Sequence, residues 1–99
     1  MKNKYFLYVE GDTNEGNYIG KLSELGEVSE KEVKEIAHKV LSFHGYNFIN
    51  GSYDDIDPSI DEDEAAYLKE RFIPYNDDCG EYCYDVTSVE IIKGDIVPF

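Results

Sequence analysis

Apolar and aromatic residues are concentrated at the start of the chain. The run Lys4–Glu10 is rich in aromatic and β-branched residues, which predicts a strand. The polar, glycine-containing run 11–17 predicts a turn. Tyr18–Leu25 is then expected to pair back as a hairpin, although Gly20 weakens this second strand. Because the first strand is the most apolar, we expect it in the centre of the sheet.

A helical pattern begins at Ser29. Ser29 and Glu32 have the spacing of a capping box, in which each side chain satisfies a free backbone N–H of the first turn. One apolar stripe follows at positions i, i+3, i+4, i+7, i+8 and i+11: Val33, Ile36, Ala37, Val40, Leu41 and His44. Gly45 stands where a helix-terminating glycine is expected. The stripe predicts a helix that packs on the sheet, with Leu41 buried and His44 at the helix end.

A second helix is expected after residues 46–59, which have the composition of a loop with at most a short extended piece at Asn47–Ile49. The run Asp57-Pro58-Ser59, with Ser59 and Glu62 as a second capping box, is typical of a helix entry. Ala65, Leu68 and Phe72 form a thin apolar stripe, and Pro74 ends the helix by residue 73.

Residues 81–93 predict a final long strand, whose β character is marked by Thr87, Val89, Ile91 and Ile92. The expected order is therefore β-β-α-α-β in a single domain, residues 1–99, since 99 residues leave no room for a second domain. The economical fold is α+β: a small three-stranded antiparallel sheet with two helices on one face.

Charge divides the chain into unequal halves. Residues 1–50 carry six lysines and eight acids, whereas residues 51–99 carry three bases and fourteen acids, so their net charges are −2 and −11. The total of −13 argues against a protein that binds nucleic acid or an anionic membrane directly, because both need positive charge. Halophilic adaptation would acidify both halves, so we expect the asymmetry to serve binding.

Tyrosines are interleaved with these acids, and tyrosine is enriched at interfaces. We therefore predict an acidic recognition face with Tyr53 as its anchor, which imitates a track of phosphates. Its predicted residues are Tyr53, Asp54, Asp55, Asp57, Asp61, Glu62, Asp63, Glu64, Tyr75, Asp77 and Asp78. The alternative without a binding role is a solvent-exposed surface whose acids at residues 61–64 are stabilised by a helix dipole.

Two acidic segments raise the alternative of a bound cation. The run from Asp12 to Glu24 resembles a calcium-binding EF-hand loop, but its glycine and its last carboxylate are each displaced by one position. Asp54, Asp55 and Asp57 could also hold a hard cation. No nucleophile motif or phosphate-binding loop is present, and His38 and His44 are the only histidines, so we predict no catalytic residues, no metal and no cofactor.

The two cysteines, Cys79 and Cys83, are too few for a disulfide framework or a zinc site. Reduced thiols in a cytosolic protein are the default interpretation, and a disulfide within the 79–83 loop is the alternative. No run of apolar residues approaches the length of a membrane span, and the N-terminus lacks a signal-peptide pattern. We therefore expect a cytoplasmic protein without a membrane partner.

The run from Val9 to Ile19, VEGDTNEGNYI, resembles the opening of small bacterial and phage proteins. In size and acidity the whole chain is similar to phage anti-defence proteins, including anti-CRISPR proteins and DNA mimics. This class is defined by charge and size, so the resemblance transfers no individual residue. It implies a non-catalytic inhibitor that binds the basic nucleic-acid-binding surface of a defence or nuclease complex. The alternatives are an immunity protein or antitoxin that masks a nuclease, a calcium-binding module and a small enzyme. A free sheet edge and exposed tyrosines permit a homodimer as well as a monomer.

Overall fold

Nine helices and strands make up the described part of the chain, residues 2–13 and 15–94 of a computed structural model. In order they are β1 (Lys2–Asp12), β2 (Tyr18–Ser29), α1 (Glu30–Leu41), β3 (His44–Asn47), β4 (Ser52–Asp55), α2 (Glu62–Phe72), β5 (Tyr75–Asn76), β6 (Glu81–Tyr82) and β7 (Asp85–Lys93). The mixed fold with two helices and a three-stranded antiparallel sheet is confirmed. The predicted order β-β-α-α-β is wrong, because two short hairpins, β3–β4 and β5–β6, are added to it.

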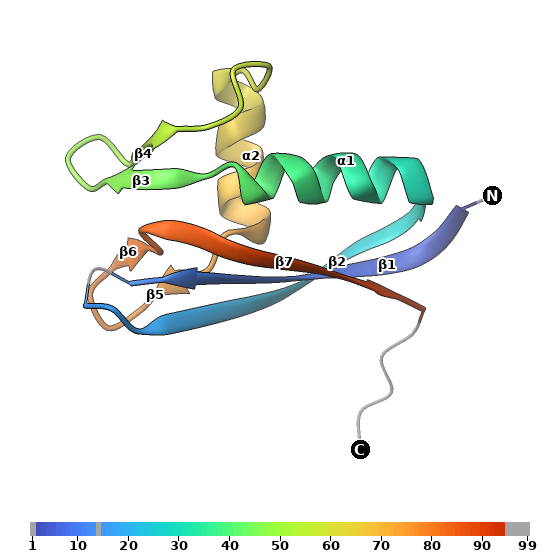
Figure 1. The fold of residues 1–99 in the computed structure, drawn as a ribbon, viewed down its shortest axis with the longest axis horizontal. Helices are drawn as coiled ribbons and strands as arrows, with labels where there is room; N and C mark the ends of the chain where they lie inside the picture. Colours follow the sequence, from blue (N-terminus) through green and yellow to red (C-terminus); the bar gives the residue numbers. More distant parts are fainter. Residues whose placement is uncertain (1, 14, 95–99) are drawn as a thin grey trace.

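The three-stranded sheet has the order β2-β1-β7, with both neighbours antiparallel to β1 (Figure 1). The apolar first strand is therefore central, as its composition predicts. Tyr5, Leu7 and Val9 alternate onto the buried face of β1. Gly20, which weakens β2 on propensity alone, leaves space for a neighbour: a Cβ at this position would collide with the hydroxyl of Tyr8. Here the glycine accommodates an aromatic ring of the adjacent strand.

Helix α1 begins as its capping box predicts. The Glu32 amide donates to the Ser29 hydroxyl at 3.1 Å, and the Ser29 amide donates to the Glu32 carboxylate at 3.4 Å. Val33, Ala37 and Val40 are buried against the sheet.

The predicted end of this helix is wrong in two respects. Leu41 is 42% exposed. At 100° per residue it lies about 80° from Val33, at the margin of the stripe. His44 is the first residue of β3 rather than the end of the helix, because Ser42 caps α1 by donating its hydroxyl to the Lys39 carbonyl at 2.7 Å.

Helix α2 starts later than the second capping box predicts. Asp61 is its N-cap, and its carboxylate accepts the Glu64 amide at 2.8 Å. The expected entry at residues 57–59 forms a separate turn, because the Asp57 carboxylate accepts both the amide and the hydroxyl of Ser59. Ile60 then inserts into the core before the helix begins. The end at Phe72, just before Ile73 and Pro74, is as predicted.

The hairpin β3–β4 replaces the predicted loop. Its turn is held by side-chain acceptors, since the Asn47 side chain accepts the Ile49 amide at 2.9 Å and the Asn50 side chain accepts the Ser52 amide at 3.0 Å. Its strand β3 is fastened to the start of β7: the Tyr46 amide donates to the Tyr84 carbonyl at 3.0 Å. The hairpin is therefore attached to the chain that leads into β7, an edge strand of the sheet.

The predicted long strand 81–93 is broken at Cys83 and Tyr84. The Cys83 amide turns to the Pro74 carbonyl at 2.9 Å, and the Tyr84 amide turns to the Asp12 carbonyl at 2.8 Å. The first part becomes β6, which pairs with β5, and only the second part, β7, joins the sheet. Gly11 lies against this break, where an added Cβ would collide with the Cys83 sulfur.

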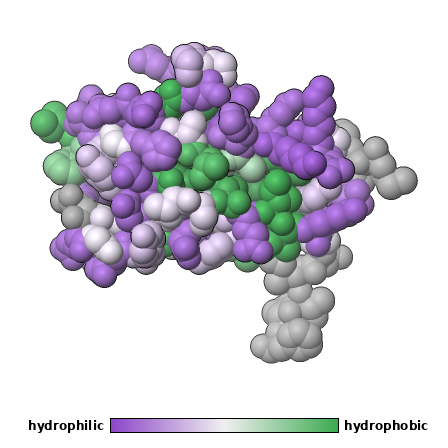
Figure 2. Space-filling model, in the orientation of Figure 1, coloured by the Kyte–Doolittle hydropathy of each residue, from purple (hydrophilic) through white to green (hydrophobic). Residues whose placement is uncertain are grey.

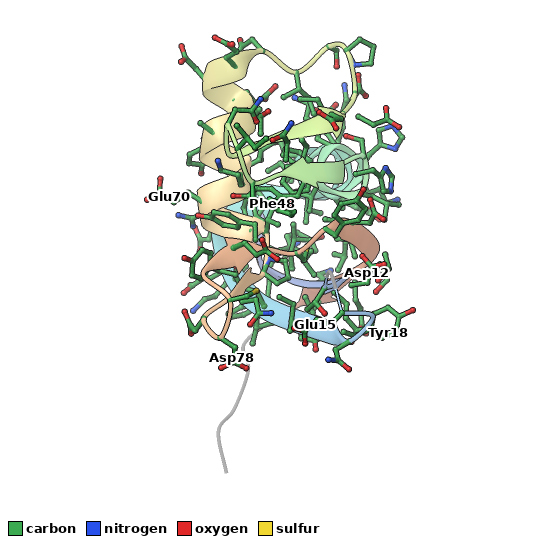
Figure 3. The ribbon with its side chains drawn as sticks, turned by 90° about the vertical axis from the view of Figure 1, so that its left-hand side faces the viewer. Asp12, Glu15, Tyr18, Phe48, Glu70 and Asp78 are labelled. Carbon is green, nitrogen blue, oxygen red and sulfur yellow. The ribbon has the colours of Figure 1, made fainter. Side chains whose placement is uncertain are left out.

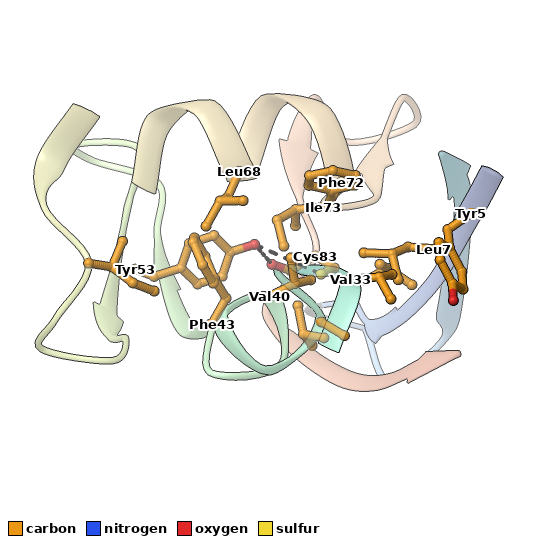
Figure 4. Close-up of a cluster of buried hydrophobic side chains, with 14 residues drawn as sticks. Tyr5, Leu7, Val33, Val40, Phe43, Tyr53, Leu68, Phe72, Ile73 and Cys83 are labelled. Carbon is orange, nitrogen blue, oxygen red and sulfur yellow. Dashed lines mark hydrogen bonds between the residues drawn. The ribbon is translucent and has the colours of Figure 1, made fainter. Parts of the chain in front are cut away.

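The core lies between the sheet and the helices, which sit on the same side of the sheet (Figures 1 and 4). It continues under the β3–β4 hairpin through Phe43 and Tyr53, whose rings meet edge to face at a centroid distance of 5.2 Å. The buried members are Tyr5, Leu7, Val9, Val33, Ala37, Val40, Phe43, Tyr53, Ile60, Leu68, Phe72, Ile73, Cys83 and Val86. One continuous cluster therefore joins the sheet, both helices and the β3–β4 hairpin.

Candidate interaction surface

Tyr53, the predicted anchor of the acidic face, is a core residue. Its side chain is 8% exposed, and its hydroxyl donates to the Cys83 carbonyl at 2.6 Å (Figure 4). Burial raises the pKa of this phenol far above its ordinary value. Because both ring and hydroxyl are used inside the protein, the prediction that Tyr53 contacts a partner is wrong.

Three of the predicted acids have roles within the fold. Asp57 accepts the hydrogen bonds of Ser59, and these bonds lower the pKa of the Asp57 carboxyl. Asp61 caps α2. Glu64 forms an ion pair with Lys39 at 2.9 Å, which joins α2 to α1 and raises the pKa of the lysine. These carboxylates are accounted for by local structure.

Six predicted carboxylates have neither an ion pair nor a side-chain hydrogen bond among the described residues, and all six are exposed: Asp54, Asp55, Glu62, Asp63, Asp77 and Asp78. Four lie on β4 and the first turn of α2, and two lie in the β5–β6 turn. These groups are near opposite ends of α2, which at 1.5 Å per residue is about 16 Å long. The structure therefore divides the predicted face into two acidic clusters.

The second cluster belongs to one end of the molecule that we call the hairpin end. The turns of the hairpins β1–β2, β3–β4 and β5–β6 all reach this end (Figure 1). Figure 3 looks onto it and shows Phe48 at the same end as three acids, Asp12, Glu15 and Asp78.

Exposed apolar side chains also reach the hairpin end. Phe48 is 59% exposed and Ile49 is 93% exposed, both in the β3–β4 turn. Hydrogen bonds to the Asn47 and Asn50 side chains hold this turn, so its stability does not depend on burying Phe48 and Ile49. In Figure 2, apolar surface is visible at the tip of this hairpin and again between α1 and β7. Leu41 of α1 and Ile91 of β7 are 42% and 38% exposed.

Four aromatic rings form a continuous series that joins two of the hairpins, and we call it the aromatic row: Phe48, Tyr46, Tyr82 and Tyr75. Successive ring centroids are 6.5, 6.0 and 4.9 Å apart. The two end rings are exposed and the two central rings are half-buried. Of these residues, only Tyr75 is in the predicted site.

A cation already lies against this row. The Lys69 ammonium is 5.3 Å from the centroid of the Tyr82 ring and donates to the Gly51 carbonyl at 2.6 Å. Carboxylates flank the row as well. Burial raises the pKa of Tyr46 and of Tyr82, and the negative charges of Glu81 and Glu70, respectively, raise these pKa values further. The row therefore combines π-faces with a negative electrostatic environment.

The sequence contains a signal for the β3–β4 hairpin that the prediction of a loop over residues 46–59 overlooks. Asn50-Gly51 is a strong hairpin signal, and the apolar pair Phe48-Ile49 precedes it. A hairpin places such a pair at its tip, where the chain reverses and burial is least available. The pairing of Tyr46 with Tyr82 depends on how two hairpins meet, which no local pattern encodes.

The other residues singled out in the sequence are an aspartate, a histidine and the two cysteines. Asp12 ends β1, and its carboxylate accepts the Asp85 amide at 3.0 Å, so it belongs to a strand connection. His38 is exposed, 4.0 Å from the Asp57 carboxylate. Cys79 and Cys83 are both free thiols, so the alternative of a disulfide between them is not realised. Cys83 is buried, which raises the pKa of its thiol to about 11.

Among the described residues, no three or more His, Cys, Asp and Glu side chains are grouped as metal ligands would be. No helix in that part of the chain has the length and apolar character needed to cross a membrane. No family model matches the chain, and no curated protein or solved structure is significantly similar to it.

Proposed function

We propose that this chain is a non-catalytic acidic protein that binds the basic nucleic-acid-binding surface of another protein and thereby excludes nucleic acid. The observation that carries the proposal is the set of six exposed carboxylates without ion-pair partners among the described residues. Unneutralised charge of one sign destabilises a compact state through self-repulsion. Its retention is therefore best explained by a gain that arises on binding.

The partner class follows from charge complementarity. A surface that binds nucleic acid presents lysine and arginine along a groove, and such a surface attracts any body with spaced negative charges. The two acidic clusters, separated by about the length of α2, offer such spacing. A bacterial defence complex or nuclease in the cytoplasm is the partner that we propose, in keeping with the resemblance to phage anti-defence proteins.

The test compares two variants with the same change in charge. Asp54, Asp55 and Asp63 are replaced by Asn in the first variant, and the exposed Glu27, Glu35 and Glu90 are replaced by Gln in the control. Nucleic-acid-binding proteins of a bacterial lysate are captured on the immobilised chain at low salt and eluted with double-stranded DNA. Association rates of the eluted protein are then measured at two ionic strengths.

The expected result is a roughly 10-fold or greater loss of association rate and a shallower salt dependence for the first variant, because steering is a collective effect of nearby charges. The control should associate at nearly the wild-type rate. Equal association rates of the two variants would mean that association depends on the net charge and not on where the carboxylates lie. A captured protein that DNA does not elute would contradict the proposed competition.

A further inference from the structure

Only the two central rings of the aromatic row serve the fold, because Tyr46 and Tyr82 pack against the buried cluster. The end rings of the row lie largely in water: Phe48 is 59% exposed and Tyr75 is 47% exposed. The neighbouring Ile49 is 93% exposed. Exposed apolar side chains gathered at one place, rather than scattered singly, mark interaction sites. Together with the carboxylates of the same end, they form a surface that is both apolar and negative.

We propose that the aromatic row is the anchor site for arginine side chains of the basic partner. This inference rests on the proposed function and deepens it, since it names the side chain that is recognised and the place where it binds. A guanidinium stacks on the face of an aromatic ring through cation–π attraction, and it does so more readily than a lysine ammonium because it is planar and more weakly hydrated.

The internal contact of Lys69 shows that the row accommodates a cation. Its ammonium lies 5.3 Å from the Tyr82 centroid, within the range of a cation–π interaction, and it also has a carbonyl acceptor at 2.6 Å. The two end rings receive no such cation among the described residues. Phe48 and Tyr75 are therefore the positions that remain open to a partner's guanidinium.

The negative charges around the aromatic row favour a cationic side chain over the bases of a nucleic acid. The carboxylates of Asp77 and Asp78 lie in the turn that joins β5 to β6, and Glu81 follows directly in β6. A guanidinium stacked on Tyr75 would find acceptors nearby for its N–H groups. Single-stranded nucleic acid also stacks on aromatic rows, but its phosphates would be repelled by these carboxylates, so we argue for the basic protein.

The experiment uses two blocked peptides of equal charge, hexa-arginine and hexa-lysine, as probes of the full chain. Affinities are measured at physiological salt by titration, with the ring and amide resonances followed by NMR. The test variant is Phe48→Ala/Tyr75→Ala. The matched control is Leu41→Ala/Tyr67→Ala, which removes side chains of similar exposure, 42% and 57%, outside the row.

We expect each ring that is engaged to strengthen hexa-arginine binding by about 2- to 5-fold and hexa-lysine binding by less, so that the wild-type chain prefers hexa-arginine. Resonance shifts should be concentrated on the aromatic row, the test variant should lose the preference, and the control should keep it. Equal affinity of the wild-type chain for both peptides overturns the inference. So does a preference that survives in a folded test variant, or an oligothymidine that binds the row in place of the peptide.

The two proposals fail separately. If the row variant binds the captured basic protein as the wild type does, while the Asp54/Asp55/Asp63 variant does not, the anchor site is wrong and the proposed function stands. If neither variant changes association with that protein, both proposals are wrong. If only the row variant loses binding, the anchor site stands and the collective electrostatic mechanism is wrong.

Discussion

Replacing Tyr53 by Phe isolates one buried hydrogen bond. The change keeps the ring, which packs edge to face on Phe43, and removes only the hydroxyl that donates to the Cys83 carbonyl at 2.6 Å. That carbonyl then lies unsatisfied in a core where water cannot replace the donor. Leaving a buried acceptor without its partner costs about 1–3 kcal/mol, a large share of the roughly 5–15 kcal/mol that stabilises a typical domain.

Urea denaturation measures this loss of stability. Unfolding is followed by far-ultraviolet circular dichroism because the chain has no tryptophan whose fluorescence could report it. The midpoint should fall with little change in slope, and the melting temperature should drop by about 4–8 °C for each kcal/mol lost. Tyr75→Phe is the matched control: Tyr75 is 47% exposed, so its change should stay within about 0.5 kcal/mol. A Tyr53→Phe variant as stable as this control would refute the placement of Tyr53 in the core. Reduced affinity of a stable, folded variant for the partner would restore Tyr53 as an interface residue.

Two further predictions test burial at other positions. Val40→Ala should destabilise the protein by about 2–3 kcal/mol, through lost burial and an added cavity, whereas Leu41→Ala should cost less than about 1 kcal/mol because Leu41 is 42% exposed. Equal urea midpoints for these two variants would contradict the orientation of α1. Stability should also fall as the pH rises from about 9 to 11, because the unfolded Cys83 thiol loses its proton near its ordinary pKa while the folded thiol, with a pKa of about 11, retains it. Each proton released on unfolding contributes about 1.4 kcal/mol per pH unit, so a Cys83→Ala variant with the wild-type slope would show that Cys83 is not the group responsible.

The elements that the sequence predicts well are those governed by local chemistry. The start of α1 follows from the reciprocal bonds of Ser29 and Glu32, which depend only on residues three apart. The end of α2 follows from Pro74, and the central place of β1 follows from its apolar composition. In these cases the determining interaction lies within the segment, or the position of the segment follows from how apolar it is.

The elements that were missed depend on contacts that propensity and spacing do not reveal. The predicted start of α2 at Ser59 is wrong because the Asp57 carboxylate accepts the amide and hydroxyl of Ser59, and Asp61 caps the helix instead. The break before β7 arises because the Cys83 and Tyr84 amides find carbonyl acceptors in Pro74 and Asp12. Residues 81–93 have strand propensity throughout, so propensity cannot show where the pairing partner changes.

The prediction of Tyr53 as an anchor failed for a related reason. Tyrosines beside acids look alike in sequence, yet Tyr53 alternates inward on β4 between exposed neighbours, Ser52 and Asp54, and is buried. Tyr75 lies in a strand of only two residues, where half of its surface stays in water. The side of a strand that faces the core is set by tertiary packing, so adjacency to acids could not distinguish a core tyrosine from a surface one.

The same distinction separates the acids by what they do in the folded state. Glu62 and Asp63 occupy the first turn of α2, where the helix dipole stabilises a negative charge and so offsets part of the repulsion between them. Asp77 and Asp78 lie in a turn with no such compensation, and they lie close in the chain to Tyr75, whose ring is exposed and would need a partner to bury it. Repulsion among carboxylates and exposure of aromatic surface are each unfavourable in the isolated chain. Both are relieved together by a cationic, partly apolar group such as a guanidinium, and for this reason the hairpin end is the part of the surface where a binding function explains most.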